Sequence, residues 1–127
     1  MHIEEIDDGK VLEHWDCNDL QEGMKAGKVL LIDLRTPQEY MFESIRGALL
    51  LPMANYDTAF LPAGGDKQIV FHCGSGVRSR KVAGQFLAAG HDRAAHLEGG
   101  FAAWKAAHKP YIGTDMASGA PVKVNNA

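Results

Sequence analysis

The sequence predicts an α/β protein with a mainly parallel, five-stranded sheet and helices on both of its faces. Continuous apolar runs such as Val29–Ile32 are typical of strands that are buried on both sides. They alternate with segments whose apolar residues recur at helical spacing, such as Arg78–Ala89. Strand–helix alternation implies right-handed crossovers between parallel strands. With 127 residues, 46% of them apolar and 23% charged, the chain suits one globular domain.

The first half of the chain contains two predicted helices and three predicted strands. Asp16 is a good N-cap and Gly27 a good C-terminal stop, which together predict a helix over Asp16–Ala26. Pro37 suits a first helical position and opens a short helix that ends at about Glu43. The strands expected around these helices are Val11–Leu12, Val29–Ile32 and a buried strand, Ala48–Leu51, that Pro52 stops.

The second half repeats the alternation of strands and helices. A loop around Pro62–Asp66 leads into a strand over Gln68–His72. The helix Arg78–Ala89 follows and ends at a glycine. A small-residue strand, Ala94–Leu97, then precedes a last helix from Phe101 to about Ala107. We therefore expect one domain over residues 1–108, with residues 109–127 as an extended or disordered tail because prolines and glycines interrupt its periodicity.

Composition argues against several classes of partner. The formal net charge of −3 does not favour nucleic acid or a membrane surface. The acidic N-terminus lacks the apolar core of a signal peptide, so we expect a cytoplasmic protein. The two cysteines, Cys17 and Cys73, form no disulfide framework, and a cytosol would keep them reduced. Two nearby acids raise the pKa of Cys17, which we interpret as a structural thiol.

The chemistry concentrates in the run Ile69–Ser79, where an apolar strand delivers Cys73 into a glycine-bearing turn and a helix begins at once. Backbone N–H groups of such a turn, a helix N-terminus and the guanidinium of Arg78 all stabilise negative charge. Cys73 is therefore expected to ionise readily and act as a nucleophile. Because ligand sites lie beyond the carboxyl ends of parallel strands, Asp33–Arg35 and Glu98–Gly100 should join this loop on one rim.

The length of the loop bears on what it holds. Four residues separate Cys73 from Arg78, one fewer than in the phosphate-binding loop of cysteine phosphatases. The tighter ring suits a small charged atom on the cysteine, such as the outer sulfur of a persulfide, better than a tetrahedral oxyanion. A cysteine phosphatase or arsenate reductase is therefore a disfavoured alternative. A second alternative is a non-catalytic or regulatory module that carries the persulfide passively.

Four segments carry a resemblance to a known family. His72–Ser79 resembles the active-site loop of rhodanese-like sulfurtransferases, and Leu31–Tyr40, Ile45–Ala48 and Leu97–Trp104 are similar to further motifs of that family, in the same order. The chain departs from the family where Glu and Ser replace the usual Gly-His before Ile45. The loop is also similar to that of mercaptopyruvate sulfurtransferases, which continue with Ser or Thr where this chain has Arg78.

The resemblance implies a rhodanese fold and a thiosulfate-type sulfurtransferase that needs no metal or organic cofactor. Cys73 would take a sulfane sulfur from thiosulfate, mercaptopyruvate or glutathione persulfide. It would pass that sulfur to a small thiol, to cyanide or to a protein acceptor. Loop N–H groups would stabilise the persulfide anion. With Cys73 as the catalytic residue, the residues implied to bind substrate are Gly74, Ser75, Gly76, Val77, Arg78 and Ser79, supported by Asp33 and Arg35.

Some roles stay open on sequence grounds. Arg78 either binds an anionic donor or pairs with a carboxylate across the rim. Ser79 is expected to cap the helix rather than bond the persulfide. Asp33 and Arg35 are expected to form a buried structural pair. Strand alternation turns His72 away from Cys73, which excludes it as a general base.

Overall fold

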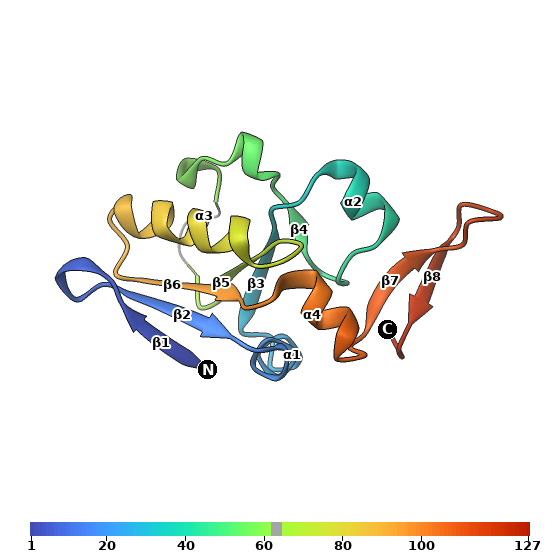
Figure 1. Cartoon of the computed structure of the whole chain (residues 1–127), viewed down its shortest axis with the longest axis horizontal. Helices are drawn as coiled ribbons and strands as arrows, with labels where there is room; N and C mark the ends of the chain where they lie inside the picture. Colours follow the sequence, from blue (N-terminus) through green and yellow to red (C-terminus); the bar gives the residue numbers. More distant parts are fainter. Residues whose placement is uncertain (62–64) are drawn as a thin grey trace.

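The computed structural model describes residues 1–61 and 65–127, so most of the loop expected at Pro62–Asp66 lies outside the described residues. Its central sheet consists of β1 (His2–Glu5), β2 (Val11–Trp15), β3 (Val29–Asp33), β4 (Leu49–Leu50), β5 (Gln68–His72) and β6 (Arg93–Leu97). These six strands lie in the order β1-β2-β6-β5-β3-β4, and only β1 is antiparallel to its neighbour (Figure 1). The α/β class and the mainly parallel sheet are confirmed, and the number of strands is six rather than five.

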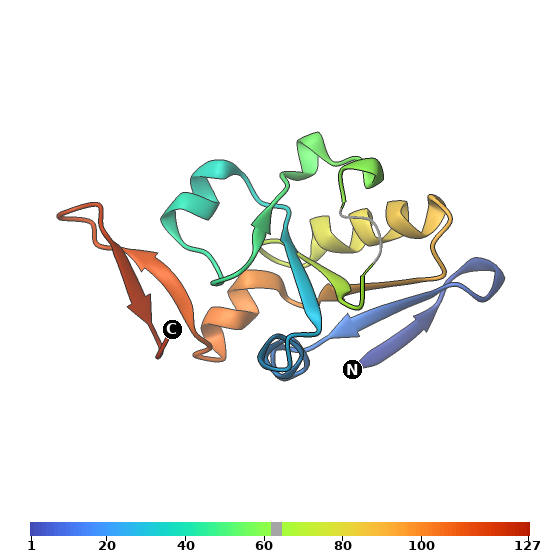
Figure 2. The same ribbon diagram turned by 180° about the vertical axis from the view of Figure 1, so that it is seen from behind.

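Helices on the two faces of the sheet create two hydrophobic cores. The four α-helices are α1 (Cys17–Lys25), α2 (Pro37–Phe42), α3 (Val77–Ala88) and α4 (Gly100–Ala106), and the short 3-10 helices are η1 (Asp7–Gly9), η2 (Met53–Asn55) and η3 (Thr58–Phe60). Figures 1 and 2 show α3 on one side of the strands and α1 on the other. The adjacent residues Val70 and Phe71 of β5 point into different cores, so the sheet is buried on both faces. In the described part of the chain, no helix is long and apolar enough to cross a membrane.

Local signals placed most element ends correctly. The carboxylate of Asp16 accepts the backbone N–H of Asp19 at 2.8 Å and caps α1 as expected. The hydroxyl of Thr36 does the same for α2, where Pro37 takes the first position. The strand expected at Ala48–Leu51 is present, but it is shorter than expected and is not buried. Strand β4 is only two residues long and lies at the edge of the sheet, where the side chain of Leu49 is 48% exposed.

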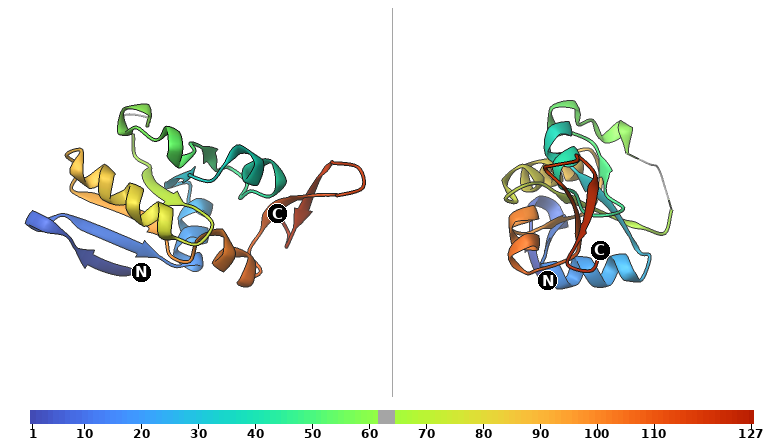
Figure 3. Two further views of the ribbon diagram at one scale, coloured as in Figure 1. Left: turned by 45° about the horizontal axis from the view of Figure 1, so that its top comes forward. Right: turned by 90° about the vertical axis from the view of Figure 1, so that its right-hand side faces the viewer.

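Residues 109–127, expected as an extended or disordered tail, contain a β-hairpin of β7 (Tyr111–Thr114) and β8 (Pro121–Val124). Figure 3 shows this hairpin at the end of the molecule opposite the β1–β2 turn. Reciprocal backbone hydrogen bonds of 2.8 and 2.9 Å join Ile112 to Ser44. Tyr111 packs against the hydrophobic core that contains Val70. Gly119 has a φ of 75°, so a residue interpreted as a breaker serves the turn instead.

The start of α4 is packed directly against the loop that follows β5. The backbone N–H groups of Phe101 and Ala102 donate to the carbonyls of Cys73 and Gly74 at 2.8 and 3.0 Å. Gly100 has a φ of 60°, and a Cβ at this position would lie 2.5 Å from the Cys73 carbonyl oxygen. A residue without a side chain is therefore required for α4 to hold the cysteine loop in place.

Two glycine substitutions should change stability in opposite directions. Gly100→Ala combines left-handed strain with a backbone clash, so we expect it to lower the free energy of unfolding by at least about 2 kcal/mol. Gly84 lies on the exposed side of α3, and nothing lies within 4 Å of a Cβ added there. Gly84→Ala should therefore raise the free energy of unfolding by about 0.5–1 kcal/mol. Urea unfolding of both variants measures this, and equal effects would contradict the packing argument.

Candidate active site

Cys73 lies at the carboxyl end of β5, at the floor of the turn that leads into α3. Its side chain is fully buried. The sulfur accepts two backbone N–H groups, from Gly76 at 3.1 Å and from Ser79 at 3.3 Å. Gly76 can aim its N–H inward because it adopts a left-handed conformation with a φ of 96° and serves as the N-cap of α3. The loop is thus a ring of donors around one sulfur.

The donors around the sulfur favour its ionised form. Burial acts to raise the pKa of the Cys73 thiol. Its effect is outweighed by hydrogen-bond donors that lower the pKa, namely the backbone N–H groups of Ser79, Ser75 and Gly76 and the hydroxyl of Ser79. The pKa of Cys73 therefore lies below its ordinary value. Backbone groups of the loop and of the first turn of α3 therefore activate this thiol. A thiolate held in this way can act as a nucleophile.

Arg78 lies across the rim from α2. Its Nη1 atom is 3.4 Å from Oε1 of Glu39, so the guanidinium pairs with a carboxylate, one of the two roles expected from the sequence. A Cβ on Gly74 would lie 3.3 Å from Nη2, which places the guanidinium over the cysteine loop. The side chains of Arg78 and Glu39 are 36% and 40% exposed, so water screens the pair and it contributes little to stability.

Ser79 does not cap α3, which corrects the expectation for this residue. The N-cap is Gly76, and no side chain in the described part of the chain makes a capping hydrogen bond there. The hydroxyl of Ser79 lies three residues into the helix, 2.9 Å from Nδ1 of His96 and 3.2 Å from the Gly76 carbonyl oxygen. Sequence reasoning missed His96 as a neighbour of the cysteine loop. Its signal was the alternation along β6, which turns Ala94 and His96 towards the same face.

Asp33 and Arg35 form the expected buried pair on the other face of the sheet. Nη2 and Nε of Arg35 donate to the carboxylate of Asp33 at 2.9 and 3.1 Å. Burial acts to raise the pKa of Asp33, but His72 and Arg35 hold it well below its usual range. The guanidinium stacks over the ring of Phe101, 4.5 Å from the centroid. This pair secures α4 beside the loop.

His72 belongs to the Asp33 side of the sheet. Its Nε2 atom is 3.4 Å from Oδ2 of Asp33, and its ring meets that of Phe101 edge to face. Cys73, the next residue, belongs to the core under α3. The prediction that His72 faces away from the thiol is therefore confirmed, and its role is to support Asp33.

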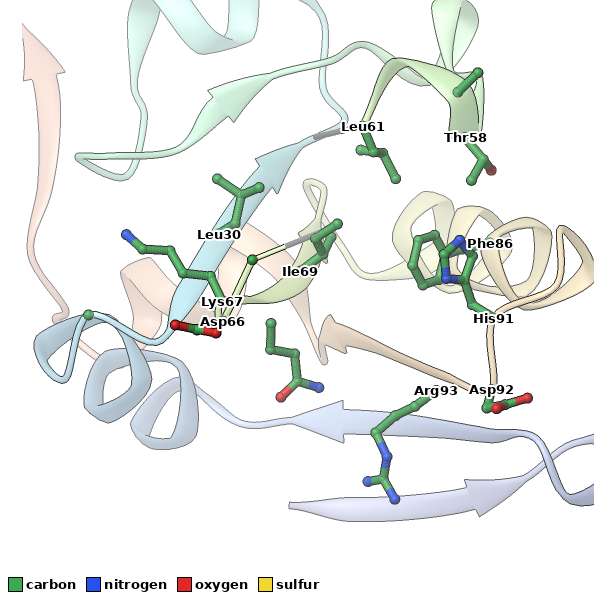
Figure 4. A pocket seen from close by; sticks show the side chains of 14 residues that line it. Leu30, Thr58, Leu61, Asp66, Lys67, Ile69, Phe86, His91, Asp92 and Arg93 are labelled. Atoms are coloured by element: carbon green, nitrogen blue, oxygen red, sulfur yellow. The ribbon is translucent and has the colours of Figure 1, made fainter. Parts of the chain in front are cut away.

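Two cavities differ in the residues that line them. One, of about 530 Å³, opens beside the cysteine loop and is lined by Ser75, Gly76, Val77, His14, His96, Arg80, Lys81, Glu98 and Gly99. The other, of about 1190 Å³, lies at the amino ends of β3, β5 and β6, where Phe86 and His91 stack (Figure 4). Ser75, Gly76 and Val77 of the cysteine loop line the smaller cavity, whereas no residue of that loop is among the described residues that line the larger cavity, so the smaller one is the candidate substrate site. Within residues 1–61 and 65–127, no three metal-ligating side chains are grouped to hold a metal ion.

Comparison with known proteins gives a consistent family. An uncharacterized protein of Synechocystis sp. is 37% identical over 98 residues, which cover 77% of this chain and 55% of that protein. A sulfurtransferase of Allochromatium vinosum is 37% identical over 76 residues, covering 60% of this chain and 71% of that protein. The chain thus spans about half the length of its Synechocystis relative.

Solved structures and the family profile agree with these relatives. A thiosulfate sulfurtransferase from Pseudomonas aeruginosa matches with a TM-score of 0.72 over 80% of this chain and 20% of that chain; at 23% identity this is a likeness of fold alone. The sequence profile of the rhodanese-like domain matches residues 16–107. This range includes strands β3 to β6 and the whole cysteine loop. The chain therefore belongs to the family of rhodanese-like domains.

Proposed function

We propose that this protein is a sulfurtransferase that carries a sulfane sulfur on Cys73 as a persulfide. The observation that carries the proposal is the buried sulfur of Cys73, which accepts N–H groups from Gly76 and Ser79 at 3.1 and 3.3 Å. These donors stabilise a thiolate before the reaction and a persulfide anion after it. The likeness to the sulfurtransferase of A. vinosum supports the same assignment.

The proposed reaction has two steps. The Cys73 thiolate attacks the outer sulfur of thiosulfate, the S–S bond of the donor breaks, and sulfite leaves with the bonding electron pair. The outer sulfur, now bonded to Cys73, carries the negative charge. An acceptor thiolate or cyanide then attacks this sulfur and releases the Cys73 thiolate. Splitting the transfer into two displacements is covalent catalysis.

The surroundings of the loop suit small anionic donors. Arg78 lies over the loop, and among residues 1–61 and 65–127 its one ion-pair partner is the exposed carboxylate of Glu39, so a donor anion can take the place of that carboxylate. Thiosulfate is the donor we propose first, with mercaptopyruvate and glutathione persulfide as further donors. The partners we propose are such small molecules and thiol, cyanide or protein acceptors, and not nucleic acid or membranes.

The free thiols bear on where the protein works. Cys17 and Cys73 are both unpaired cysteines, and a persulfide carrier needs its thiol reduced between turnovers. We therefore propose a reducing compartment such as the cytoplasm.

Loading with thiosulfate should add the mass of one sulfur atom to the protein, and Cys73→Ser should abolish this gain, because only Cys73 lies within the ring of donors. Cys17→Ser is the matched control and should load as the wild type does. Intact-protein mass spectrometry measures both. Failure of the wild type to gain sulfur from thiosulfate, mercaptopyruvate and glutathione persulfide would refute the proposal. Cys73-dependent hydrolysis of an aryl phosphate would support a phosphatase instead.

The two thiols should ionise in different pH ranges. The pKa of Cys73 is lowered by its N–H donors, whereas burial and then Asp16 raise that of Cys17 against the opposing effect of Lys109. A lowered pKa means that the thiolate persists at a lower pH. In single-cysteine variants, ultraviolet absorbance of the thiolate should therefore rise at lower pH for Cys73 than for Cys17. The reverse order would contradict the role given to the loop.

Arg78→Ala should weaken donor binding more than it weakens the fold. Loss of a charge-assisted contact predicts a KM for thiosulfate about tenfold higher, equivalent to about 1.4 kcal/mol, with kcat little changed. The free energy of unfolding should change by less than about 1 kcal/mol, because the pair with Glu39 is exposed. Arg46→Ala, at another exposed arginine, is the control. An unchanged KM for thiosulfate would show that Arg78 does not bind the donor and only pairs with Glu39.

A further inference from the structure

The ion pair beside the cysteine loop leaves one atom of each charged group without a partner. Nη1 of Arg78 lies 3.4 Å from Oε1 of Glu39, and this oxygen also accepts the backbone N–H of Thr36 at 3.0 Å. Within residues 1–61 and 65–127, Nη2 of Arg78 and Oε2 of Glu39 have no hydrogen-bond partner. The pair therefore offers a free cationic donor and a free anionic acceptor.

Both free atoms lie over the backbone of Gly74, the residue that follows Cys73. A Cβ added to Gly74 would lie 3.3 Å from Nη2 of Arg78 and 4.0 Å from Oε2 of Glu39. Unlike Gly76, Gly74 has no positive φ, so its backbone conformation does not demand a glycine. What the missing side chain provides is space between the two charges and the cysteine loop.

The carboxylate of Glu39 is held in place by its own helix. Thr36 and Glu39 form the capping box of α2, in which the carboxylate accepts the backbone N–H of Thr36 and the Thr36 hydroxyl accepts that of Glu39 at 3.2 Å. Oε1 is thus engaged twice, which fixes the direction of Oε2. A carboxylate that is ordered before a ligand arrives loses little conformational freedom on binding. The side chain is still 40% exposed, so a solute can reach it.

We propose that Arg78 and Glu39 together bind the head group of an α-amino acid thiol, such as cysteine, as the acceptor of the sulfur. The α-carboxylate of this ligand accepts from Nη2 of Arg78, and its α-ammonium donates to Oε2 of Glu39. The ion pair itself stays intact, because each contact uses an atom that the pair leaves free. The inference rests on the proposed function, whose acceptor it narrows from any thiol to a zwitterionic one.

The bound amino acid takes the sulfur in the second step of the transfer. Its thiolate attacks the outer sulfur of the Cys73 persulfide, the bond between that sulfur and Cys73 breaks, and Cys73 keeps the bonding electron pair as a thiolate. The product is the persulfide of the amino acid. Sulfite has left in the first step, so the guanidinium of Arg78 is free to bind the carboxylate of the acceptor after it has bound the donor anion.

The two free atoms discriminate between thiols by the charged groups that these carry. A zwitterion satisfies both atoms. A thiol with a carboxylate alone brings a like charge next to Glu39, and a thiol with an ammonium alone does the same to Arg78, so each of them loses one contact and meets one repulsion. The pair is thus a specificity device for the acceptor.

The test follows the release of sulfur from the loaded protein, apart from the loading step. Parent and variants are loaded with thiosulfate to completion and freed of the donor by gel filtration. Four thiols are then added separately: L-cysteine, 3-mercaptopropionate without the ammonium, cysteamine without the carboxylate, and 2-mercaptoethanol without either group. Intact-protein mass spectrometry measures the rate at which the added sulfur is lost. Division of each variant's rate by that of the parent cancels the intrinsic reactivity of the thiol.

Each variant should slow the thiols that carry the charge it recognises. Glu39→Gln removes a charge but keeps the capping box, in which glutamine also serves. Relative to 2-mercaptoethanol, it should slow transfer to L-cysteine and to cysteamine by about fivefold. Arg78→Ala should slow transfer to L-cysteine and to 3-mercaptopropionate by about the same factor. Glu22→Gln, which removes an exposed charge from α1, is the matched control and should change no ratio.

The thiolates of L-cysteine and 2-mercaptoethanol carry the same net charge, so a difference between them reports local contacts rather than long-range attraction. Equal effects of Glu39→Gln and Arg78→Ala on these two thiols would overturn the proposal. A parent protein that gains no sulfur from any donor would refute the proposed function instead.

The site is then tested without sulfur transfer by S-methyl-L-cysteine, which has the head group but no thiol. Its binding should shift the NMR signal of the Gly74 amide in the parent protein, and the affinity should be about fivefold lower in Glu39→Gln. Absence of this shift in the parent, or an equal affinity in Glu39→Gln, would overturn the zwitterion site.

Discussion

The whole site depends on supplying hydrogen-bond donors to a sulfur that the fold buries completely. The sulfur of Cys73 is fully buried, and a buried charge without partners is strongly disfavoured. The fold answers with the N–H groups of Gly76 and Ser79, which are available because α3 begins at this point and its first N–H groups have no partner within the helix. The position of the helix start therefore determines which N–H groups the sulfur of Cys73 accepts.

That constraint explains the packing of α4 as well. The carbonyls of Cys73 and Gly74 need donors of their own, which the N–H groups of Phe101 and Ala102 in the first turn of α4 supply at 2.8 and 3.0 Å. Close contact of two backbones leaves no room for a Cβ at Gly100. Two helix N-termini therefore serve one loop, the first binding its sulfur and the second its carbonyls.

Sequence patterns predicted what local chemistry decides. The bounds of β5 and the cap of α1 follow from apolar runs and capping residues that act within a few positions. Strand β1 was missed because His2–Glu5 is a polar edge strand without an apolar run. The hairpin of β7 and β8 was missed because backbone hydrogen bonds attach it to Ser44, a residue far away in the chain. The bond between Ser79 and His96 joins a helix to a strand, and no local pattern reports which distant side chain fills that position.

The two arginines of the rim show how burial separates structure from function. Arg35 is 5% exposed and binds Asp33 through two nitrogens, so removal of either partner would strand a charge inside the protein, which costs about 3–5 kcal/mol. Arg78 pairs with Glu39 through one contact of 3.4 Å at the solvent-exposed surface, where such a pair contributes about 0–1 kcal/mol to the free energy of unfolding. Exchange of the carboxylate for another anion is therefore compatible with the fold at Arg78 and incompatible with it at Arg35. Residue type alone does not distinguish them, whereas their solvent exposure does.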